Sequence, residues 1–167
     1  MTTKLLNNEV IEQVEEIFTG LQEPVQVLFF GSQQDCDYCD DTLQLVQEVV
    51  DISDKLELSI YDIEDDAALA SQYNVDKAPG LVLAGRDGDQ ILDYGVRYAG
   101  IPSGHEFSSL IHTLLLVSGR DSDLSKDTRQ KLQELDTPVH LMVFVTPTCP
   151  YCPRAVILAH QMAMESP

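Results

Sequence analysis

Two Cys-x-x-Cys pairs constrain what this chain can fold into. They are Cys149-Pro-Tyr-Cys152 and, far upstream, Cys36-Asp-Tyr-Cys39, and together they contain all four cysteines of the chain. Each pair follows an apolar run typical of a strand and precedes a run with helical spacing. A cysteine at the start of a helix lies near unpaired backbone N–H groups and the positive end of the helix dipole, which stabilise a thiolate. Because the thiolate is the nucleophile in disulfide exchange, this setting predicts reversible redox chemistry.

A structural zinc site is the main alternative, since two such pairs can supply four thiolates to one Zn²⁺. Zinc ribbons usually separate their pairs by about 15–20 residues, whereas here a stretch the size of a domain intervenes. The strand–loop–helix context also favours redox chemistry over a ribbon, so we predict no metal site. The histidines show no spacing typical of a ligand or catalytic pair; they are His105, His112, His140 and His160.

The charge balance excludes several classes of function. The chain carries 28 acidic and 10 basic residues, a formal net charge of -18 over 167 residues. Nucleic-acid binding needs a basic surface, and an anionic membrane repels such a chain. No run approaches the roughly 18 apolar residues of a membrane span, and residues 1–9 lack the apolar region of a signal peptide. We therefore expect a cytoplasmic protein without nucleic-acid or membrane partners.

Apolar periodicity predicts alternating helices and strands. The predicted helices cover residues 4–21, the run that leads from the first cysteine pair to residue 50, residues 66–73 and residues 103–117. The predicted strands cover residues 25–30, 56–61, 81–84 and 90–94. A turn is expected at 85–88 and a loop at 95–102. Ser103 and Glu106 have the spacing of a capping box at the start of the last helix. This order predicts a parallel β-α-β start followed by an antiparallel hairpin.

The pattern then restarts as an internal repeat with an offset of about 114 residues. A helix is predicted at 124–135, a strand at 139–145 and an apolar helix after the second cysteine pair. We therefore predict a first unit at 1–118, a linker at 119–123 and a second unit at 124–167. The second unit holds one strand and one helix, which leaves unpaired sheet edges. We expect either that the chain is a piece of a longer protein or that another chain completes this unit.

These features together resemble the protein disulfide oxidoreductases, glutaredoxin-like proteins with two tandem thioredoxin folds. Residues 146–153, Thr-Pro-Thr-Cys-Pro-Tyr-Cys-Pro, look like the glutaredoxin-type motif. Val75-x-x-Ala-Pro79 is similar to the proline segment at a strand entrance in thioredoxin folds, and residues 97–107 look like the family's segment before the last helix of the first unit. The resemblance implies an α/β thioredoxin-like fold, with a mixed central sheet flanked by helices.

The resemblance also implies roles for the cysteines. The first of each pair, Cys36 and Cys149, attacks the substrate, and the second, Cys39 and Cys152, resolves the mixed disulfide. The redox-active disulfides are then Cys36–Cys39 and Cys149–Cys152, and the chain needs no other cofactor. Four aspartates surround Cys36, whereas Arg154 accompanies Cys149. Since nearby carboxylates disfavour a thiolate, we expect a lower thiol pKa at Cys149.

Four further residues are expected to form the substrate site. The resemblance implies that Pro79 is cis and lies against the first cysteine pair, so that the backbone of Ala78 faces an extended peptide. Tyr38 and Tyr151, inside the two motifs, either cover the disulfides or contact substrate. The second unit contains no counterpart of Pro79, which departs from the family pattern.

The expected function is thiol–disulfide exchange with protein disulfides. The resemblance implies that electrons come from a thioredoxin-reductase-like flavoprotein or from a small thiol. A non-catalytic thioredoxin-fold binding module or redox sensor is the alternative, because the acidic first motif opposes thiolate formation. The sequence leaves open whether the protein acts as oxidase, reductase or isomerase.

Overall fold

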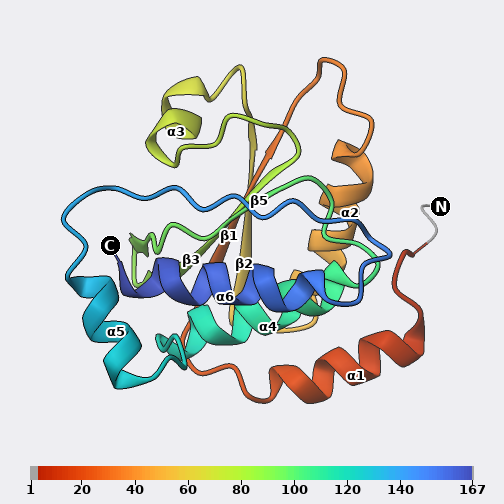
Figure 1. Cartoon of the computed structure of the whole chain (residues 1–167). Helices are drawn as coiled ribbons and strands as arrows, with labels where there is room; N and C mark the ends of the chain where they lie inside the picture. The colour runs from red at the N-terminus through yellow and green to blue at the C-terminus, as the bar shows by residue number, and fades with distance from the viewer. Residues whose placement is uncertain (1–3, 167) are drawn as a thin grey trace.

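A mixed five-stranded sheet forms the centre of the computed structural model, which describes residues 4–166 (Figure 1). Residues 1–3 and 167, which the predicted units include, lie outside the described range. The strand order is β2-β1-β3-β4, with β5 also pairing with β3; β1 and β2 are parallel and the other pairs are antiparallel. The strands are β1 (Val25–Gly31), β2 (Leu56–Asp62), β3 (Gly80–Asp87), β4 (Gln90–Leu92) and β5 (Arg97–Ala99).

Helices cover both faces of this sheet. Alternate residues of β1 point to opposite faces: Val27 and Phe29 pack against α1, α2 and α4, whereas Leu28 and Phe30 pack against α3. Both cores are apolar, which explains why β1 is buried along its whole length. The helices are α1 (Asn8–Phe18), α2 (Cys39–Val50), α3 (Ala67–Gln72), α4 (Glu106–Gly119), α5 (Lys126–Gln133) and α6 (Cys152–Glu165). No helix within residues 4–166 is long and apolar enough to cross a bilayer.

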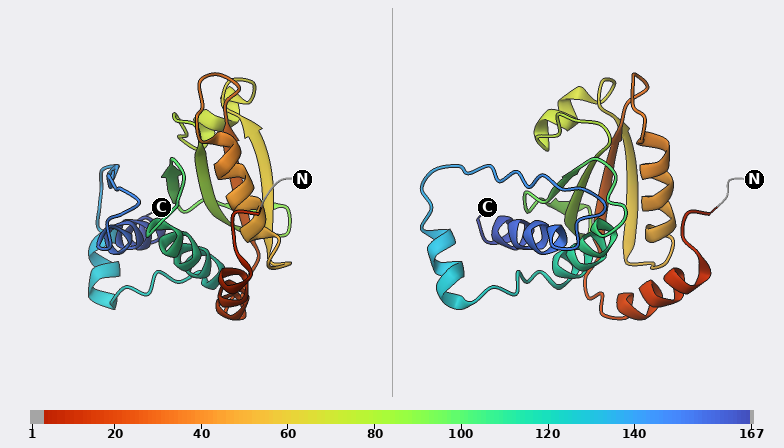
Figure 2. Two further views of the ribbon diagram at one scale, coloured as in Figure 1. Left: turned by 90° about the vertical axis from the view of Figure 1, so that its right-hand side faces the viewer. Right: turned by 45° about the vertical axis from the view of Figure 1, so that its right-hand side comes forward.

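Helix α6 packs beside α4, as all the views show (Figures 1 and 2). A buried hydrogen bond joins the two helices, between Nδ1 of His160 and Oγ1 of Thr113 at 3.1 Å. Ala163 and Met164 of α6 reach the main core. Helix α6, which begins at the second cysteine pair, therefore packs on the same core as α4.

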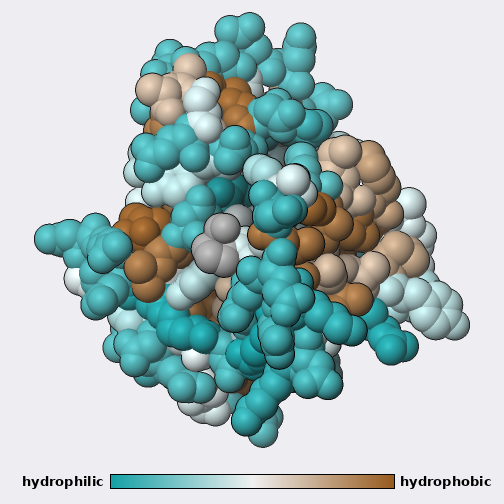
Figure 3. All heavy atoms as spheres, turned by 60° about the vertical axis from the view of Figure 1, so that its left-hand side comes forward, coloured by the Kyte–Doolittle hydropathy of each residue, from teal (hydrophilic) through white to brown (hydrophobic). Residues whose placement is uncertain are grey.

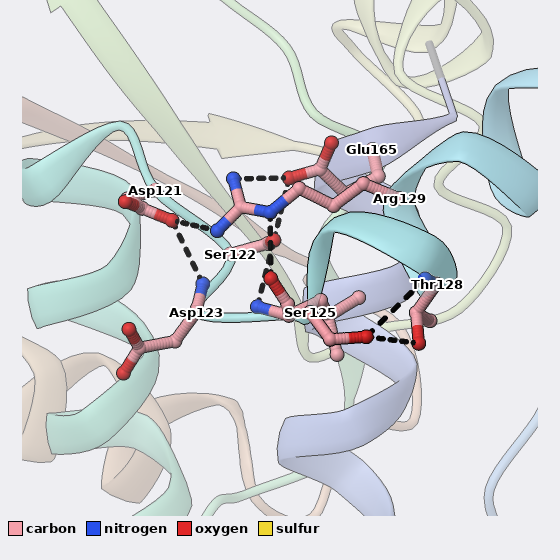
Figure 4. A network of polar contacts seen from close by, with 8 residues as sticks. Asp121, Ser122, Asp123, Ser125, Thr128, Arg129 and Glu165 are labelled. Carbon is pink, nitrogen blue, oxygen red and sulfur yellow. Dashed lines mark hydrogen bonds and ion pairs between the residues drawn. The ribbon is translucent and has the colours of Figure 1, made fainter.

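The predicted linker is a tightly bonded turn between α4 and α5 (Figure 4). The Arg129 guanidinium bridges Asp121 at 2.5 Å and Glu165 at 3.0 Å, and the Ser122 hydroxyl donates to Glu165 at 2.5 Å. The backbone N–H of Asp123 and the Arg129 guanidinium hold the pKa of Asp121 below its ordinary value. These bonds connect the end of α4 to the end of α6.

Three local expectations were wrong. Strand β3 continues through residues 85–87, so that the turn is confined to Gly88 and Asp89, and the expected loop at 95–102 contains β5. Pairing with a neighbouring strand decides both cases, and a single-sequence pattern does not show it. Ser103 does not cap α4, whose N-cap is His105, and the Glu106 carboxylate accepts a bond from Ser109 instead.

The predicted strand at 139–145 is also wrong. This segment is irregular and exposed, and no strand within residues 4–166 pairs with it. A β-strand obtains its backbone hydrogen bonds from a neighbour, so alternating apolar residues alone do not form one. Figure 3 shows apolar patches within a largely hydrophilic face of the molecule. The exposed apolar side chains of the segment are Val139, Leu141, Met142, Val143, Phe144 and Val145.

Candidate redox sites at the two cysteine pairs

The first cysteine pair lies where β1 ends and α2 begins. Cys36 and Cys39 form a disulfide with their Cα atoms 5.5 Å apart. Cys39 is the first residue of α2 and is buried, whereas Cys36 precedes the helix and is half-buried. Tyr38, the N-cap residue, makes no side-chain cap and is 57% exposed. The more accessible cysteine of this pair is therefore the one expected to attack.

A cavity of about 380 Å³ opens beside Cys36. Ala78 also lines it, and the Ala78–Pro79 bond is cis, as the resemblance implies. Pro79 itself is buried. Three loops thus meet around Cys36, following β1, β2 and α3, and bring together residues about 40 positions apart. The cavity is lined by Ser32, Gln34, Asp35, Cys36, Ile63, Glu64, Asp76 and Ala78.

Hydrogen bonds hold the loop after β2 against the end of β1. The Ile63 N–H donates to the Gly31 carbonyl at 2.8 Å, and the Ser32 hydroxyl donates to Glu64 at 2.9 Å. The Asp62 carboxylate accepts the N–H groups of Glu64 and Asp65 at 2.9 and 3.1 Å. The N–H of Asp65, above all, keeps the pKa of Asp62 below its ordinary value. Glu64 is therefore held at the cavity beside Cys36.

The second cysteine pair lies at the start of α6. Cys149 and Cys152 form a disulfide, again with their Cα atoms 5.5 Å apart. Both cysteines are half-buried, so burial does not distinguish an attacking thiol from a resolving one here. Tyr151 is 78% exposed. The preceding loop contacts the start of α4, where the His105 N–H donates to the Pro147 carbonyl at 3.0 Å.

The two pairs occupy separate places, at the starts of α2 and α6. Within residues 4–166, no three cysteine, histidine or acidic side chains come together as metal ligands. Each pair is closed within itself as a disulfide.

A buried polar stripe on α4 escaped the sequence analysis. Glu106, Ser109 and Thr113 are all buried, at the i, i+3 and i+7 positions of one helix face. Glu106 Oε2 accepts a bond from Ser109 at 2.7 Å, whereas Oε1 is buried without a hydrogen-bond partner in the described residues. The helical spacing of these polar residues was visible in the sequence. The capping-box spacing of Ser103 and Glu106 assigns this carboxylate to the helix end and so hides its place in the stripe.

This stripe lies beside a larger cavity of about 620 Å³, between α6 and residues 135–145. Tyr98, His160 and Glu106 line it. The rings of Tyr98 and His160 meet edge to face, with their centroids 5.0 Å apart. Burial raises the pKa of Tyr98 to about 12 and lowers that of His160 to about 4. Both rings are therefore neutral at pH 7.

Comparison with curated proteins identifies AhpF, a component of alkyl hydroperoxide reductase, as a relative. The chain is 26% identical over 163 residues to the AhpF protein of Pseudomonas aeruginosa and 27% identical over 163 residues to that of Staphylococcus aureus. Each alignment covers 98% of this chain but only 28% and 29% of those proteins. No family model matches the chain.

Solved structures confirm the expected thioredoxin-like α/β architecture. A protein disulfide oxidoreductase of Aeropyrum pernix superposes with a TM-score of 0.87 and 31% identity, covering 96% of this chain and 68% of that one. The AhpF protein of Enterococcus faecalis superposes with a TM-score of 0.81 and 24% identity, covering 97% and 76%. The second likeness is one of fold.

Proposed function

Because the chain belongs to the protein disulfide oxidoreductases, thioredoxin-like proteins with Cys-x-x-Cys pairs, we propose that it reduces disulfides of other proteins or oxidises their thiols to disulfides. Each pair then cycles between dithiol and disulfide. The chain spans less than a third of the length of the AhpF relatives that it matches, so their overall activity is not transferred to it. The division into units at 1–118 and 124–167, and a cytoplasmic location, are part of the proposal.

One observation carries this proposal: Cys36 is half-buried at a cavity that Ala78 also lines. A substrate segment in this cavity brings its own sulfur next to Cys36 and its backbone next to Ala78. The buried Cys39 lies one helical turn away and is placed to receive the mixed disulfide. One accessible and one protected cysteine, as in this pair, suit attack on a substrate followed by resolution of the mixed disulfide.

The exchange proceeds in two balanced steps. The Cys36 thiolate attacks a substrate S–S bond, a mixed disulfide forms, and the first substrate sulfur leaves as a thiolate that takes up a proton. The Cys39 thiolate then attacks Sγ of Cys36, the mixed disulfide breaks, and the second substrate thiol is released. The substrate gains two electrons and the Cys36–Cys39 disulfide is restored. Oxidation of a substrate is the same sequence in reverse.

The second pair has the same proposed chemistry, with Cys149 attacking and Cys152 resolving. Tyr38 and Tyr151 are 57% and 78% exposed, which favours contact with a docked substrate over covering of the disulfides. A thioredoxin-reductase-like flavoprotein or a small thiol supplies the electrons. Kinship to a component of a reductase supports a flow of electrons into this chain.

A redox titration tests the proposal. The protein is equilibrated in glutathione buffers of defined potential, quenched by alkylation and analysed by mass spectrometry at each pair. We expect at least one pair to switch as a two-electron couple near the cytosolic potential, about -220 to -320 mV. The proposed function is wrong if neither pair switches as a reversible couple between about -120 and -320 mV, a range that also covers oxidising thiol–disulfide proteins.

A second candidate is a redox sensor or binding module without turnover. The carboxylates around Cys36 support it, because they oppose formation of the attacking thiolate. Catalytic amounts of protein with excess dithiothreitol and a disulfide-bonded protein substrate separate the two candidates. An oxidoreductase accelerates reduction of many substrate equivalents above the rate with dithiothreitol alone, whereas a sensor or binding module leaves that rate unchanged.

A further inference from the structure

We propose that the first redox centre, which is the Cys36–Cys39 pair with the cavity beside it, selects substrates that carry positive charge beside the reacting disulfide. Protein segments with lysine or arginine next to the cysteine are such substrates. This inference rests on the proposed function and adds the class of substrate. The reactive sulfur of Cys36 makes the neighbouring cavity a substrate site, and the charged walls of that cavity decide which substrate enters it.

Three carboxylates line the cavity together with Cys36 and Ala78. They come from three separate loops: Asp35 from the loop before α2, Glu64 from the loop after β2, and Asp76 from the loop after α3. In the described part of the chain, no lysine or arginine lines the cavity. Because the three loops converge only in the folded chain, the negative charge is a property of the site and extends beyond the acidic motif around Cys36.

Lys77, which neighbours the cavity in sequence, offsets only part of this charge. Its ammonium group contacts Asp76 at 2.7 Å, and its side chain is 62% exposed. The ion pair is therefore screened by water and salt. Glu64 is held in place by the Ser32 hydroxyl at 2.9 Å, so at least one carboxylate has a defined position at the cavity.

The exchange reaction is sensitive to the negative charge of the cavity. In the first step negative charge moves from Cys36 to the departing substrate sulfur, and both lie beside carboxylates. A cationic group on the substrate offsets that repulsion during approach and in the transition state. An anionic substrate meets repulsion at each stage. Exchange at Cys36 should therefore depend on substrate charge more strongly than exchange in free solution does.

The second centre offers an internal contrast. Residues 146–153 contain no acidic side chain, and Arg154 lies in the first turn of α6. We therefore expect no preference for cations at Cys149. Both centres belong to one molecule with one net charge, so a difference between them reports local charge.

The test uses the full chain with Cys149→Ser and Cys152→Ser, which leaves the first pair alone, and the reciprocal variant Cys36→Ser with Cys39→Ser. Each reduced protein reacts with cystamine (dicationic), hydroxyethyl disulfide (neutral) or dithiodiglycolate (dianionic). Every rate is divided by the rate of the same disulfide with dithiothreitol, which removes differences in leaving-group chemistry. At low salt we expect the first pair to prefer cystamine to dithiodiglycolate by at least about ten-fold.

Charge-neutralising variants locate the effect. Asp35→Asn, Glu64→Gln and Asp76→Asn together should reduce the preference to about two-fold or less. Asn suits position 35, where the backbone is left-handed with φ of 48°. The matched control removes three charges at the opposite end of the sheet: Asp54→Asn, Asp87→Asn and Asp89→Asn. The control should retain the preference.

The salt dependence of the preference for cystamine, measured in the protein with unaltered carboxylates, provides a second readout. Raising ionic strength from about 0.02 M to about 0.5 M should reduce the preference several-fold, because the Debye length falls. Equal normalised rates for cystamine and dithiodiglycolate at the first pair overturn the inference, as does an equal loss of preference in the control variant. If hydroxyethyl disulfide reacts at neither pair, the proposed function itself fails. This outcome distinguishes a failure of the proposed function from a failure of the charge preference alone.

Discussion

At the scale of single residues, the two cysteine pairs share a geometry and differ in charge. Both are disulfides with the same Cα separation, and both lie at the start of a helix. Carboxylates surround Cys36, whereas Arg154 is the charged residue closest in sequence to Cys149. Local charge is therefore the property by which one molecule can have two different redox centres.

This difference predicts a lower thiol pKa at Cys149 than at Cys36 in the reduced protein, because nearby carboxylates disfavour a thiolate and a guanidinium favours it. Alkylation by iodoacetamide, followed at each cysteine by mass spectrometry, should reach its half-maximal rate at lower pH for Cys149. Asp35→Asn with Asp37→Asn should move the Cys36 midpoint toward that of Cys149. Equal midpoints in the unaltered protein would contradict the prediction.

His160 predicts a pH dependence of stability. Burial lowers its pKa to about 4 in the folded protein, whereas the ordinary value is about 6.5. Below pH 6.5 the unfolded chain binds a proton that the folded chain does not, so the free energy of unfolding falls between pH 6.5 and 4. The loss attributable to His160 should reach about 2 kcal/mol at pH 5.

Urea unfolding at pH 7 and pH 5 measures this loss in the unaltered protein and in His160→Gln. Other titrating groups contribute equally to both proteins, so the difference between them isolates His160. Gln retains hydrogen-bonding groups toward Thr113 and the Arg97 carbonyl, which His160 contacts at 3.1 and 3.2 Å. The same pH dependence in both proteins would exclude a buried neutral histidine.

At the scale of elements, the start of α4 positions the second cysteine pair. Gly104 has φ of 60°, and a Cβ atom there would collide with the Pro147 carbonyl, the acceptor of the His105 N–H. Glycine is thus required both by the backbone angle and by the close approach of the loop before Cys149. Any larger residue must displace that loop.

Gly104→Ala should therefore loosen residues 146–150 and lower the free energy of unfolding by about 1–3 kcal/mol. Gly88→Ala is the matched control: its φ is 58°, but nothing lies within 4 Å of a Cβ there. It should carry the cost of the backbone angle alone. Hydrogen exchange should accelerate at 146–150 in Gly104→Ala only, and equal exchange in both variants would show that the contact is unimportant.

At the scale of the whole molecule, the protein combines a net charge of -18 with a core built from one sheet and the helices on both its faces. Mutual repulsion of surface carboxylates destabilises the compact state, and salt screens it. Helix α6 joins this body through α4 and through the bonds of Arg129 (Figure 4).

Stability should accordingly rise with salt. We expect the urea midpoint to increase between about 0.05 M and about 1 M NaCl, since the Debye length falls to about 3 Å. The variant with Asp54→Asn, Asp87→Asn and Asp89→Asn has less repulsion and should gain less from salt. A midpoint that falls with salt would show that ion pairs, such as those of Arg129, outweigh the repulsion.

Local sequence signals determined much of this protein. Alternation of apolar residues predicted β1, which is buried along its whole length, and β2, in which Leu56 is buried and Leu58 half-buried. The position of each cysteine pair, between an apolar run and a helix, predicted where the disulfides lie. The resemblance supplied the fold and the cis bond before Pro79. These features depend on residues close together in the chain, or on a motif that is itself short.

The tertiary structure decided what depends on distant partners. Residues 139–145 alternate like a strand and form none, because a strand needs a neighbour for its backbone groups. Residues 97–99 lack a strong pattern and form β5, because β3 lies beside them. Glu64 and Asp76 join Cys36 only when three loops converge. Sequence patterns report which face of an element is apolar, whereas pairing and convergence are properties of the folded chain.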